Sequence, residues 1–177
     1  ELNNKLSSFK DITFDPSLNP PFVTAKAIGD SIASFVVADL FSDTKKIIDT
    51  KGKVILLDFW YMACYGCILS YPTINKLHQD FANNNSVEIY SVNPFDLEDK
   101  QREKLKNYVK KYQMESNLVK MEVKQFDYFR KNAYPTFYVI VDGVIKAIKI
   151  GSYDDLYKEL KTLIKDGLKQ VESNSGQ

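Results

Sequence analysis

The chain has 177 residues, of which 44% are hydrophobic, 27% are charged and 13% are aromatic, with a formal net charge of +1. This length supports one hydrophobic core, and the composition is that of a globular domain rather than of a disordered chain. The near-neutral charge does not indicate nucleic acid as a partner. Because no apolar stretch approaches about 18 residues, we expect no membrane span in this chain.

The first expected elements are an irregular arm and a hairpin. Residues 1–27 carry Asn, Ser and Pro with weak periodicity, which is typical of an extended arm. The stretches 34–40 and 46–48 flank the turn residues Ser42 and Asp43, and they predict an early hairpin. Because the chain begins with Glu1 rather than Met, we expect a processed or artificially chosen end, from which a signal peptide or lipid anchor has been removed.

A buried strand followed by two cysteines is the most informative feature of the chain. The nearly continuous apolar run 54–59 predicts a strand that is covered on both faces. Cys64 and Cys67 follow it, and no other cysteine is present. The apolar spacing after Cys64 predicts a helix to about residue 83 that contains Pro72. A CxxC pair between a strand and a helix is typical of a redox-active dithiol.

Two other interpretations of the cysteine pair are weaker. A structural zinc ion needs about four ligands, and the chain offers one histidine and no further thiol. An inert disulfide across so short a loop would add little stability, because the loop-closure entropy is small. We therefore predict a dithiol that exchanges with disulfides and that requires neither a metal nor a cofactor.

Position in the chain assigns a different catalytic role to each of three residues. Cys64 opens the helix, where free backbone N–H groups and the helix dipole favour a thiolate, so we expect it to be the exposed, attacking sulfur. Cys67 lies one turn further and should resolve the mixed disulfide. Asp58 lies within the preceding strand, where burial raises the pKa of a carboxyl, and it should accept the proton of Cys67. An aspartate at a strand end, with its carboxylate in solvent, is the alternative.

Strands and helices are expected to alternate through the rest of the chain. Asp142-Gly143 is a type I′ turn sequence and predicts that two flanking strands form a hairpin. The expected elements are a strand at 87–92, a helix cap at 96–99, a charged helix to about 112, a strand at 118–123, a short helix at 126–132, strands at 136–141 and 144–150, and a helix from 153 to about 168. The domain would then span residues 28–170, with a flexible tail at 171–177.

Four short motifs occur together in this chain: Asp58-Phe59-Trp60, Cys64-Tyr65-Gly66-Cys67, Pro72, and Tyr134-Pro135-Thr136. With them the chain resembles the thioredoxin-fold thiol-disulfide oxidoreductases of the TlpA type, over about residues 28–168. Residues 28–35 and 51–54 also resemble the opening of peroxiredoxin-like and TlpA-like domains. The resemblance implies an α/β fold: a thioredoxin-like three-layer sandwich with a mixed central sheet, helices on both faces and an N-terminal hairpin extension.

The resemblance also implies which residues meet the substrate. Pro135 would be a cis-proline that faces the dithiol, and the backbone of Tyr134 would pair with an extended segment of a client protein. Tyr65, Gly66 and Trp60 complete the expected substrate-binding residues. Tyr65 and Tyr134 should flank the client groove, and exposed aromatic side chains there favour an apolar segment.

Three residues depart from the family pattern. Ala63 replaces a tryptophan that often precedes the first cysteine, and Gly66 replaces a proline that often precedes the second. Ser70 lies where many TlpA-like reductases carry a glutamate. Because the residues around the cysteines set thiolate stability, these departures leave open whether the protein acts as a reductant, an oxidant or an isomerase.

The predicted function is that of a protein-disulfide oxidoreductase. Its partners would be client proteins with disulfides or thiols and an unidentified redox protein, and its location would be extracytoplasmic, either periplasmic or secreted or membrane-tethered. One alternative is a binding or chaperone module whose dithiol is inactive or metal-loaded. A thiol peroxidase is less favoured, because Leu57 and Tyr61 occupy the positions where the peroxidase pattern before Cys64 requires Pro and Thr or Ser.

Overall fold

The computed structural model describes residues 26–32, 34–121, 126–129 and 133–175. The arm predicted for residues 1–27 therefore lies almost entirely outside the described residues. The same holds for the last residues of the strand predicted at 118–123 and of the short helix predicted at 126–132.

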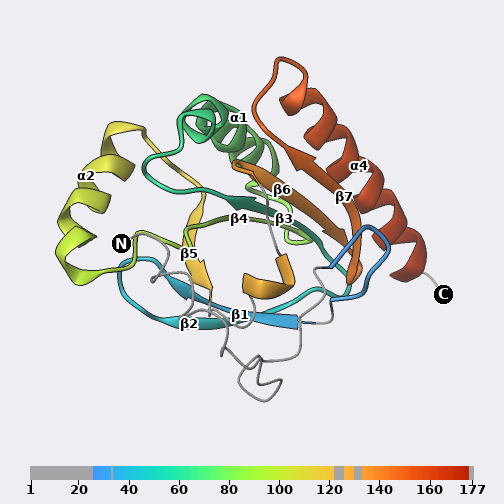
Figure 1. Ribbon diagram of the computed structural model, residues 1–177. Helices are drawn as coiled ribbons and strands as arrows, with labels where there is room; N and C mark the ends of the chain where they lie inside the picture. The colour runs from blue at the N-terminus through green and yellow to red at the C-terminus, as the bar shows by residue number, and fades with distance from the viewer. Residues whose placement is uncertain (1–25, 33, 122–125, 130–132, 176–177) are drawn as a thin grey trace, which may run out of the picture.

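A mixed sheet of seven strands in the order β2-β1-β5-β4-β3-β6-β7 forms the centre of the described fold (Figure 1). The strands are β1 (Ser34–Asp39), β2 (Lys45–Asp49), β3 (Val54–Phe59), β4 (Val87–Val92), β5 (Asn117–Met121), β6 (Thr136–Val141) and β7 (Val144–Ile150). β4 pairs in parallel with β3 and β5, whereas the other neighbours are antiparallel. The predicted mixed sheet and N-terminal hairpin are both confirmed.

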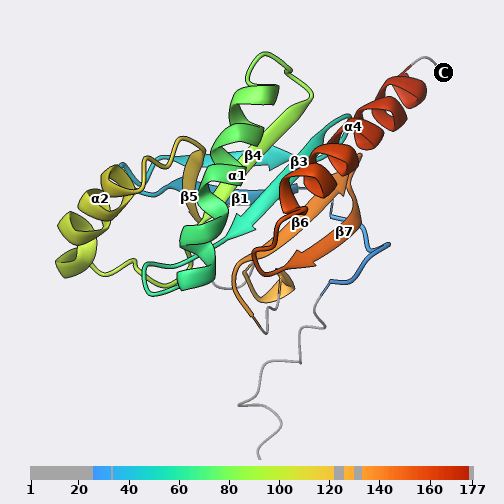
Figure 2. The ribbon, with the colours of Figure 1, turned by 90° about the horizontal axis from the view of Figure 1, so that it is seen from above.

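Two long helices cover one face of this sheet. They are α1 (Tyr65–Phe81) and α4 (Leu156–Ser175), and the view from above shows both lying over the strands (Figure 2). α2 (Arg102–Lys111), which follows the short 3₁₀ helix η2 (Asp99–Gln101), lies beside β5. On the opposite face, η3 (Asp127–Phe129) packs against β3 and the β1–β2 hairpin of the same sheet (Figure 1).

β3 is buried along its whole length because it lies between β4 and β6 and is covered on both faces. Successive side chains of a strand point to opposite faces. Val54 and Leu56 accordingly pack with residues of α1 and α4, whereas Ile55 and Leu57 pack with the hairpin and η3. Asp58 continues the first series and therefore points toward the helical face.

The closing helix is longer than the sequence predicts. α4 begins at Leu156 rather than near 153, and it continues to Ser175 rather than ending near 168. Ile164 and Val171 extend its apolar stripe along the sheet, so residues 171–175 continue the helix instead of starting a tail. The division of the chain into an arm, a domain and a tail stays a prediction.

The turn prediction at the β6–β7 hairpin is confirmed, whereas the cap prediction before α2 is wrong. Asp142 and Gly143 have φ values of 47° and 80°, as a type I′ turn requires. Glu98 precedes η2 without a capping hydrogen bond from its side chain. The carboxylate of Asp96 instead accepts a hydrogen bond from the backbone N–H of Met62, in the loop before Cys64.

Candidate active site

The two cysteines form a disulfide at the N-terminal end of α1. Cys64 is the N-cap residue, and its Sγ accepts a hydrogen bond from the backbone N–H of Cys67 at 3.1 Å. Free N–H groups and the helix dipole stabilise negative charge at this end of a helix. The reduced sulfur of Cys64 thus lies where a thiolate is stabilised, as predicted for the attacking residue.

The exposure of the attacking sulfur differs from the prediction. Cys64 is only 4% exposed and Cys67 is fully buried, so the expectation of an openly exposed Cys64 is wrong for the disulfide form. The bond holds the sulfur of Cys64 against that of Cys67, inside an apolar cluster with Trp60 and Tyr71. Cys64 is nevertheless the more accessible of the two, which agrees with the predicted order of attack.

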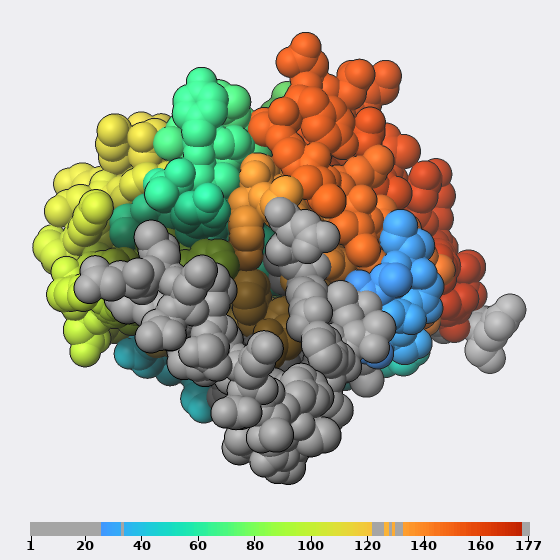
Figure 3. Space-filling model, in the orientation of Figure 1, coloured from blue at the N-terminus to red at the C-terminus, as the bar shows by residue number. Residues whose placement is uncertain are grey.

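The loop before β6 forms the wall opposite the disulfide. Its Tyr134–Pro135 peptide bond is cis, and Pro135 lies directly against Gly66. A Cβ atom added at Gly66 would lie 3.1 Å from Pro135 Cδ and 3.6 Å from the carbonyl oxygen of Tyr134. Figure 3 shows the segment that carries the dithiol next to the segment that leads into β6. Gly66 therefore permits the close approach of this wall, in addition to its predicted place at the substrate.

Asp58, the penultimate residue of β3, is fully buried. Burial raises the pKa of its carboxyl from 3.8 to about 7, and a hydrogen bond that Ser91 Oγ donates to Oδ2 at 3.1 Å opposes part of this rise. Oδ1 has no hydrogen-bond partner among the described residues. The alternative of a solvent-facing carboxylate is therefore wrong, and a carboxyl that titrates near neutral pH can both accept and return a proton.

Trp60 supports the disulfide from the interior rather than meeting a substrate. It was predicted among the substrate-binding residues, but its side chain is fully buried. The indole ring stacks on Tyr108 at 5.9 Å and meets the edge of Tyr71 at 5.9 Å. Its position follows from the alternation along the chain, because Trp60 lies two residues after Asp58 and shares its inward-facing side.

Aromatic side chains form the rim of the site. Tyr65 is 73% exposed, and Tyr134 is half-buried, as expected for residues that flank a groove. Phe95 is 53% exposed and contacts the rings of Tyr61 and Tyr134 at 5.8 Å and 5.6 Å. Sequence reasoning missed Phe95, because the preceding Asn93-Pro94 indicates only where a strand ends.

Two loops of this rim are joined by hydrogen bonds. Asp96 Oδ2 accepts one from the backbone N–H of Met62 at 2.8 Å and one from Asn93 Nδ2 at 2.9 Å. Asn93 Oδ1 in turn accepts from the backbone N–H groups of Phe95 and Asp96. The loop after β4 is thereby fixed to the loop before Cys64, which holds Phe95 in place at the rim.

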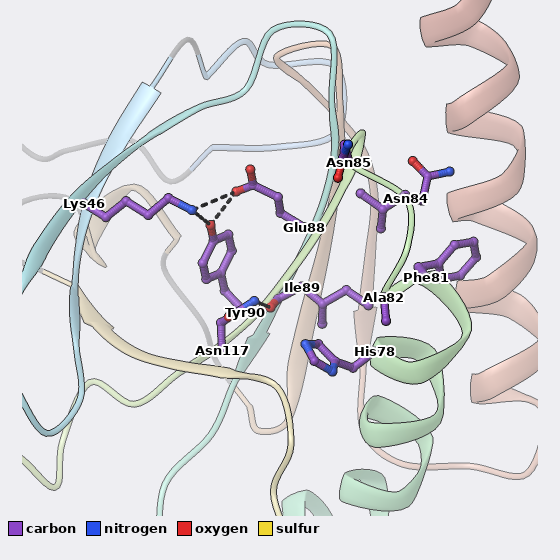
Figure 4. Close-up of a pocket in the computed structure, with 11 residues that line it drawn as sticks. Lys46, His78, Phe81, Ala82, Asn84, Asn85, Glu88, Ile89, Tyr90 and Asn117 are labelled. Atoms are coloured by element: carbon purple, nitrogen blue, oxygen red, sulfur yellow. Dashed lines mark hydrogen bonds and ion pairs between the residues drawn. The ribbon is translucent and has the colours of Figure 1, made fainter.

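A separate pocket lies at the other end of α1, away from the dithiol (Figure 4). His78, the single histidine of the chain, lines it together with Asn117. Lys46 Nζ lies 2.9 Å from Tyr90 Oη and 3.7 Å from Glu88 Oε2, and Tyr90 donates a hydrogen bond to Glu88. These charged groups therefore pair with each other, at a distance from the cysteines.

Within the described residues, no group of three or more His, Cys, Asp or Glu side chains could hold a metal ion. In the same part of the chain, no helix combines the length and the apolar character needed to cross a membrane.

The sheet has parallel strands at its centre, the dithiol lies at the start of a covering helix, and a cis-proline loop faces the dithiol. These three features together place the chain among the thioredoxin-fold proteins. A model of the AhpC/TSA family matches residues 28–148, which is more than half of the chain. The chain belongs to the AhpC/TSA family.

Individual relatives are similar over parts of the chain. Thiol-disulfide oxidoreductase ResA of Geobacillus thermodenitrificans (strain NG80-2) is 34% identical over 70 residues, which cover 40% of each protein. Thioredoxin-like protein YneN of Bacillus subtilis (strain 168) is 27% identical over 126 residues, 70% of this chain and 72% of the relative. The thioredoxin domain of a thiol-disulfide oxidoreductase from Bacteroides vulgatus superimposes with a TM-score of 0.62 at 25% identity, covering 79% of this chain and 99% of that one. The match to ResA thus spans less than half the length of that relative.

Proposed function

We propose that this chain is a protein-disulfide oxidoreductase that exchanges its Cys64–Cys67 pair with the disulfides or thiols of client proteins. The observation that carries the proposal is the placement of the disulfide at the N-cap of α1, directly opposite the loop of Pro135. A sulfur in this position is stabilised as a thiolate when reduced, and its resolving partner lies one turn away in the interior.

In the reducing direction the reaction begins with the Cys64 thiolate. It attacks one sulfur of a client disulfide, a mixed disulfide forms, and the other client sulfur leaves and takes up a proton. Cys67 then gives its proton to Asp58 and attacks Cys64 Sγ, which releases the second client sulfur. The client gains two electrons and the dithiol loses two. The same steps in reverse oxidise a client dithiol.

The proposed client is an extended apolar segment that carries the reacting sulfur. Tyr65 and Phe95 offer large exposed aromatic surfaces beside the site, and the ring of Tyr134, the residue before Pro135, contacts that of Phe95. Aromatic anchors of this kind contribute much of the binding energy in protein interfaces. In this proposal, the backbone of Tyr134 pairs with that of the client, and Gly66 leaves room for its close approach.

The direction of electron flow, the redox partner and an extracytoplasmic location belong to the same proposal. The TlpA-like motifs support the location, which a thiol-alkylation assay on cell fractions tests. For the direction, Trp60 provides a direct readout because it is the only tryptophan and packs in one cluster with both cysteines. A fluorescence titration against dithiothreitol buffers gives the midpoint, for comparison with about −270 mV for thioredoxin and about −120 mV for a strong oxidant.

Trapping of the mixed disulfide tests the proposal. A Cys67→Ser variant should accumulate a covalent adduct with a disulfide-containing client such as insulin, because the resolving sulfur is missing. A Cys64→Ser variant should form no adduct and should lose insulin reduction. If Cys64→Ser reduces insulin as fast as the unchanged protein, the dithiol is inactive and the chain is a binding or chaperone module instead.

A further inference from the structure

A chain of hydroxyl groups leads away from the buried carboxylate of Asp58. Ser116 Oγ donates a hydrogen bond to Ser91 Oγ at 2.6 Å, and Ser91 Oγ donates one to Asp58 Oδ2 at 3.1 Å. Asp58 and Ser91 are fully buried, whereas Ser116 is 8% exposed. The exposure therefore increases along the chain from the carboxylate to Ser116.

The direction of this chain follows from the strand order. Ser91 of β4 is the pairing partner of Asp58 of β3, and Ser116 directly precedes β5, the next strand on that side. Pro135 precedes β6, which lies on the other side of β3. The hydroxyl chain thus runs away from the wall where a client would lie, so a bound client would leave its outer end uncovered.

The loop that carries Ser116 is held against α1. Asn75 donates to the carbonyl of Gln113 at 2.6 Å and accepts from the backbone N–H of Glu115 at 3.0 Å. Gln79 donates to the carboxylate of Glu115 at 2.6 Å. Glu115 and Asn117, on either side of Ser116, are exposed, and Asn117 lines the pocket shown in Figure 4. Ser116 is therefore the last hydroxyl of the chain before solvent.

The other groups that face Asp58 do not offer a comparable route. From α1, Tyr71 interacts electrostatically with Asp58. Burial raises the pKa of the Tyr71 hydroxyl far above its ordinary value, so this hydroxyl stays protonated. Its hydroxyl pairs with that of Tyr108 from α2 at 3.1 Å. From β6, the residue paired with Asp58 is the apolar Phe137. Within the described residues, the hydrogen bond to the carboxylate comes from Ser91.

We propose that Ser91 and Ser116 form the proton outlet of Asp58, an inference that rests on the proposed oxidoreductase function. After Cys67 has given its proton to Asp58, the hydroxyls of Ser91 and Ser116 rotate from the orientation described above, so that the carboxyl O–H donates to Ser91, Ser91 donates to Ser116, and Ser116 donates to water. Each O–H bond breaks as the next one forms, so one proton enters the chain and one leaves it. No electrons move in this step, and the carboxylate is regenerated for the next turnover.

Carboxyl NMR on the reduced protein tests the outlet without any client. With ¹³C-labelled aspartate, the Asp58 signal of the unchanged protein should move as one sharp line through its titration, because the proton exchanges rapidly with solvent. In Ser116→Ala the line should broaden or split near the midpoint. Ser91→Ala should do the same and also shift the midpoint upward, since the ionised carboxylate loses a hydrogen bond.

Two control variants separate loss of the hydroxyl from loss of structure. Ser116→Thr keeps a hydroxyl and should restore the sharp line. Ser86→Ala removes a serine that precedes β4 just as Ser116 precedes β5, and it should leave the signal unchanged. Sharp single lines in both Ser91→Ala and Ser116→Ala would overturn the outlet.

A multiple-turnover experiment connects the outlet to the reaction, because Asp58 must lose its proton before it can accept the next one. General acid–base steps typically contribute about 10²–10⁴-fold, so Ser116→Ala should slow steady-state insulin reduction by about tenfold or more while the first attack of Cys64 and the first release of the client keep their rates. An active protein in which neither the line nor the steady-state rate responds to Ser116→Ala refutes the outlet alone. If the unchanged protein exchanges no disulfides but Ser116→Ala broadens the line, the proposed function fails and the outlet stands.

Discussion

Replacing Asp58 by asparagine should remove most of the pH dependence of stability between pH 5 and pH 8. The pKa of this carboxyl rises from 3.8 to about 7 on folding, chiefly through burial. The folded protein therefore holds the proton more tightly than the unfolded chain does. The contribution of Asp58 to stability is greatest below pH 3.8, falls as the pH rises toward 7, and is lowest above that value.

The size of the effect follows from the same two values. At about 1.4 kcal/mol for each pKa unit, ionisation of the buried carboxyl costs about 4 kcal/mol at high pH, of which about 2.5 kcal/mol appears between pH 5 and pH 8. Asparagine stays neutral and can still accept the hydrogen bond from Ser91, but a buried amide without a partner costs about 1–3 kcal/mol. The variant should thus be about as stable as the unchanged protein at pH 5 and more stable by about 1–3 kcal/mol at pH 8.

Urea unfolding of Asp58→Asn and of the unchanged protein, both with the disulfide formed, measures this difference at several pH values, with Trp60 fluorescence as the signal. The exposed Asp154 provides a matched control, because Asp154→Asn should shift the curve without changing its slope against pH. If the stabilities of Asp58→Asn and of the unchanged protein run parallel from pH 5 to pH 8, Asp58 titrates at its ordinary value. A role for Asp58 as a proton acceptor near neutral pH would then be refuted.

Two glycine substitutions test packing at and away from the site. In Gly66→Ala the new methyl group would lie 3.1 Å from Pro135 Cδ, so the wall must shift and insulin reduction should slow severalfold; an unchanged rate would show that the wall can yield freely. In Gly167→Ala the methyl group would lie 2.7 Å from Val141 Cγ2 and 3.0 Å from Val54 Cγ2, and urea unfolding should show a loss of about 1–3 kcal/mol with disulfide exchange unaffected. At an unconstrained helix position the same change stabilises by up to about 1 kcal/mol, so a gain would contradict the close packing of α4 on the sheet.

The sheet could be predicted from the sequence because its strands carry strong local signals. β3 and β6 are nearly continuous apolar runs, and the positive φ values at Asp142 and Gly143 match a turn type with a known sequence preference. The dithiol, the cis-proline loop and Asp58 lie at the edges of these runs, so their positions followed from them. The end of α4 was missed because the polar residues after Val171 resemble a tail, although one buried side chain extends the helix.

The parts of the site that the sequence did not predict depend on contacts between distant residues. Phe95 belongs to the rim only because Asp96 binds the backbone of Met62, 34 residues earlier. Ser91 and Ser116 meet through the pairing of β4 with β5, which no local pattern predicts. The burial of Trp60, by contrast, could have been found, because it directly follows the buried strand β3 and continues the alternation of Val54 and Leu56.

The bond between Asp96 and Met62 has a consequence for how this protein selects what it reacts with. Because this bond joins the loop after β4 to the loop before Cys64 before anything binds, these two loops should lose little conformational entropy when a segment enters. Discrimination between client polypeptides should then come from their steric fit to the preformed aromatic rim rather than from closure of the loops around them. Asp96→Ala, which removes this hydrogen bond, should make the protein less selective among client segments without changing either cysteine.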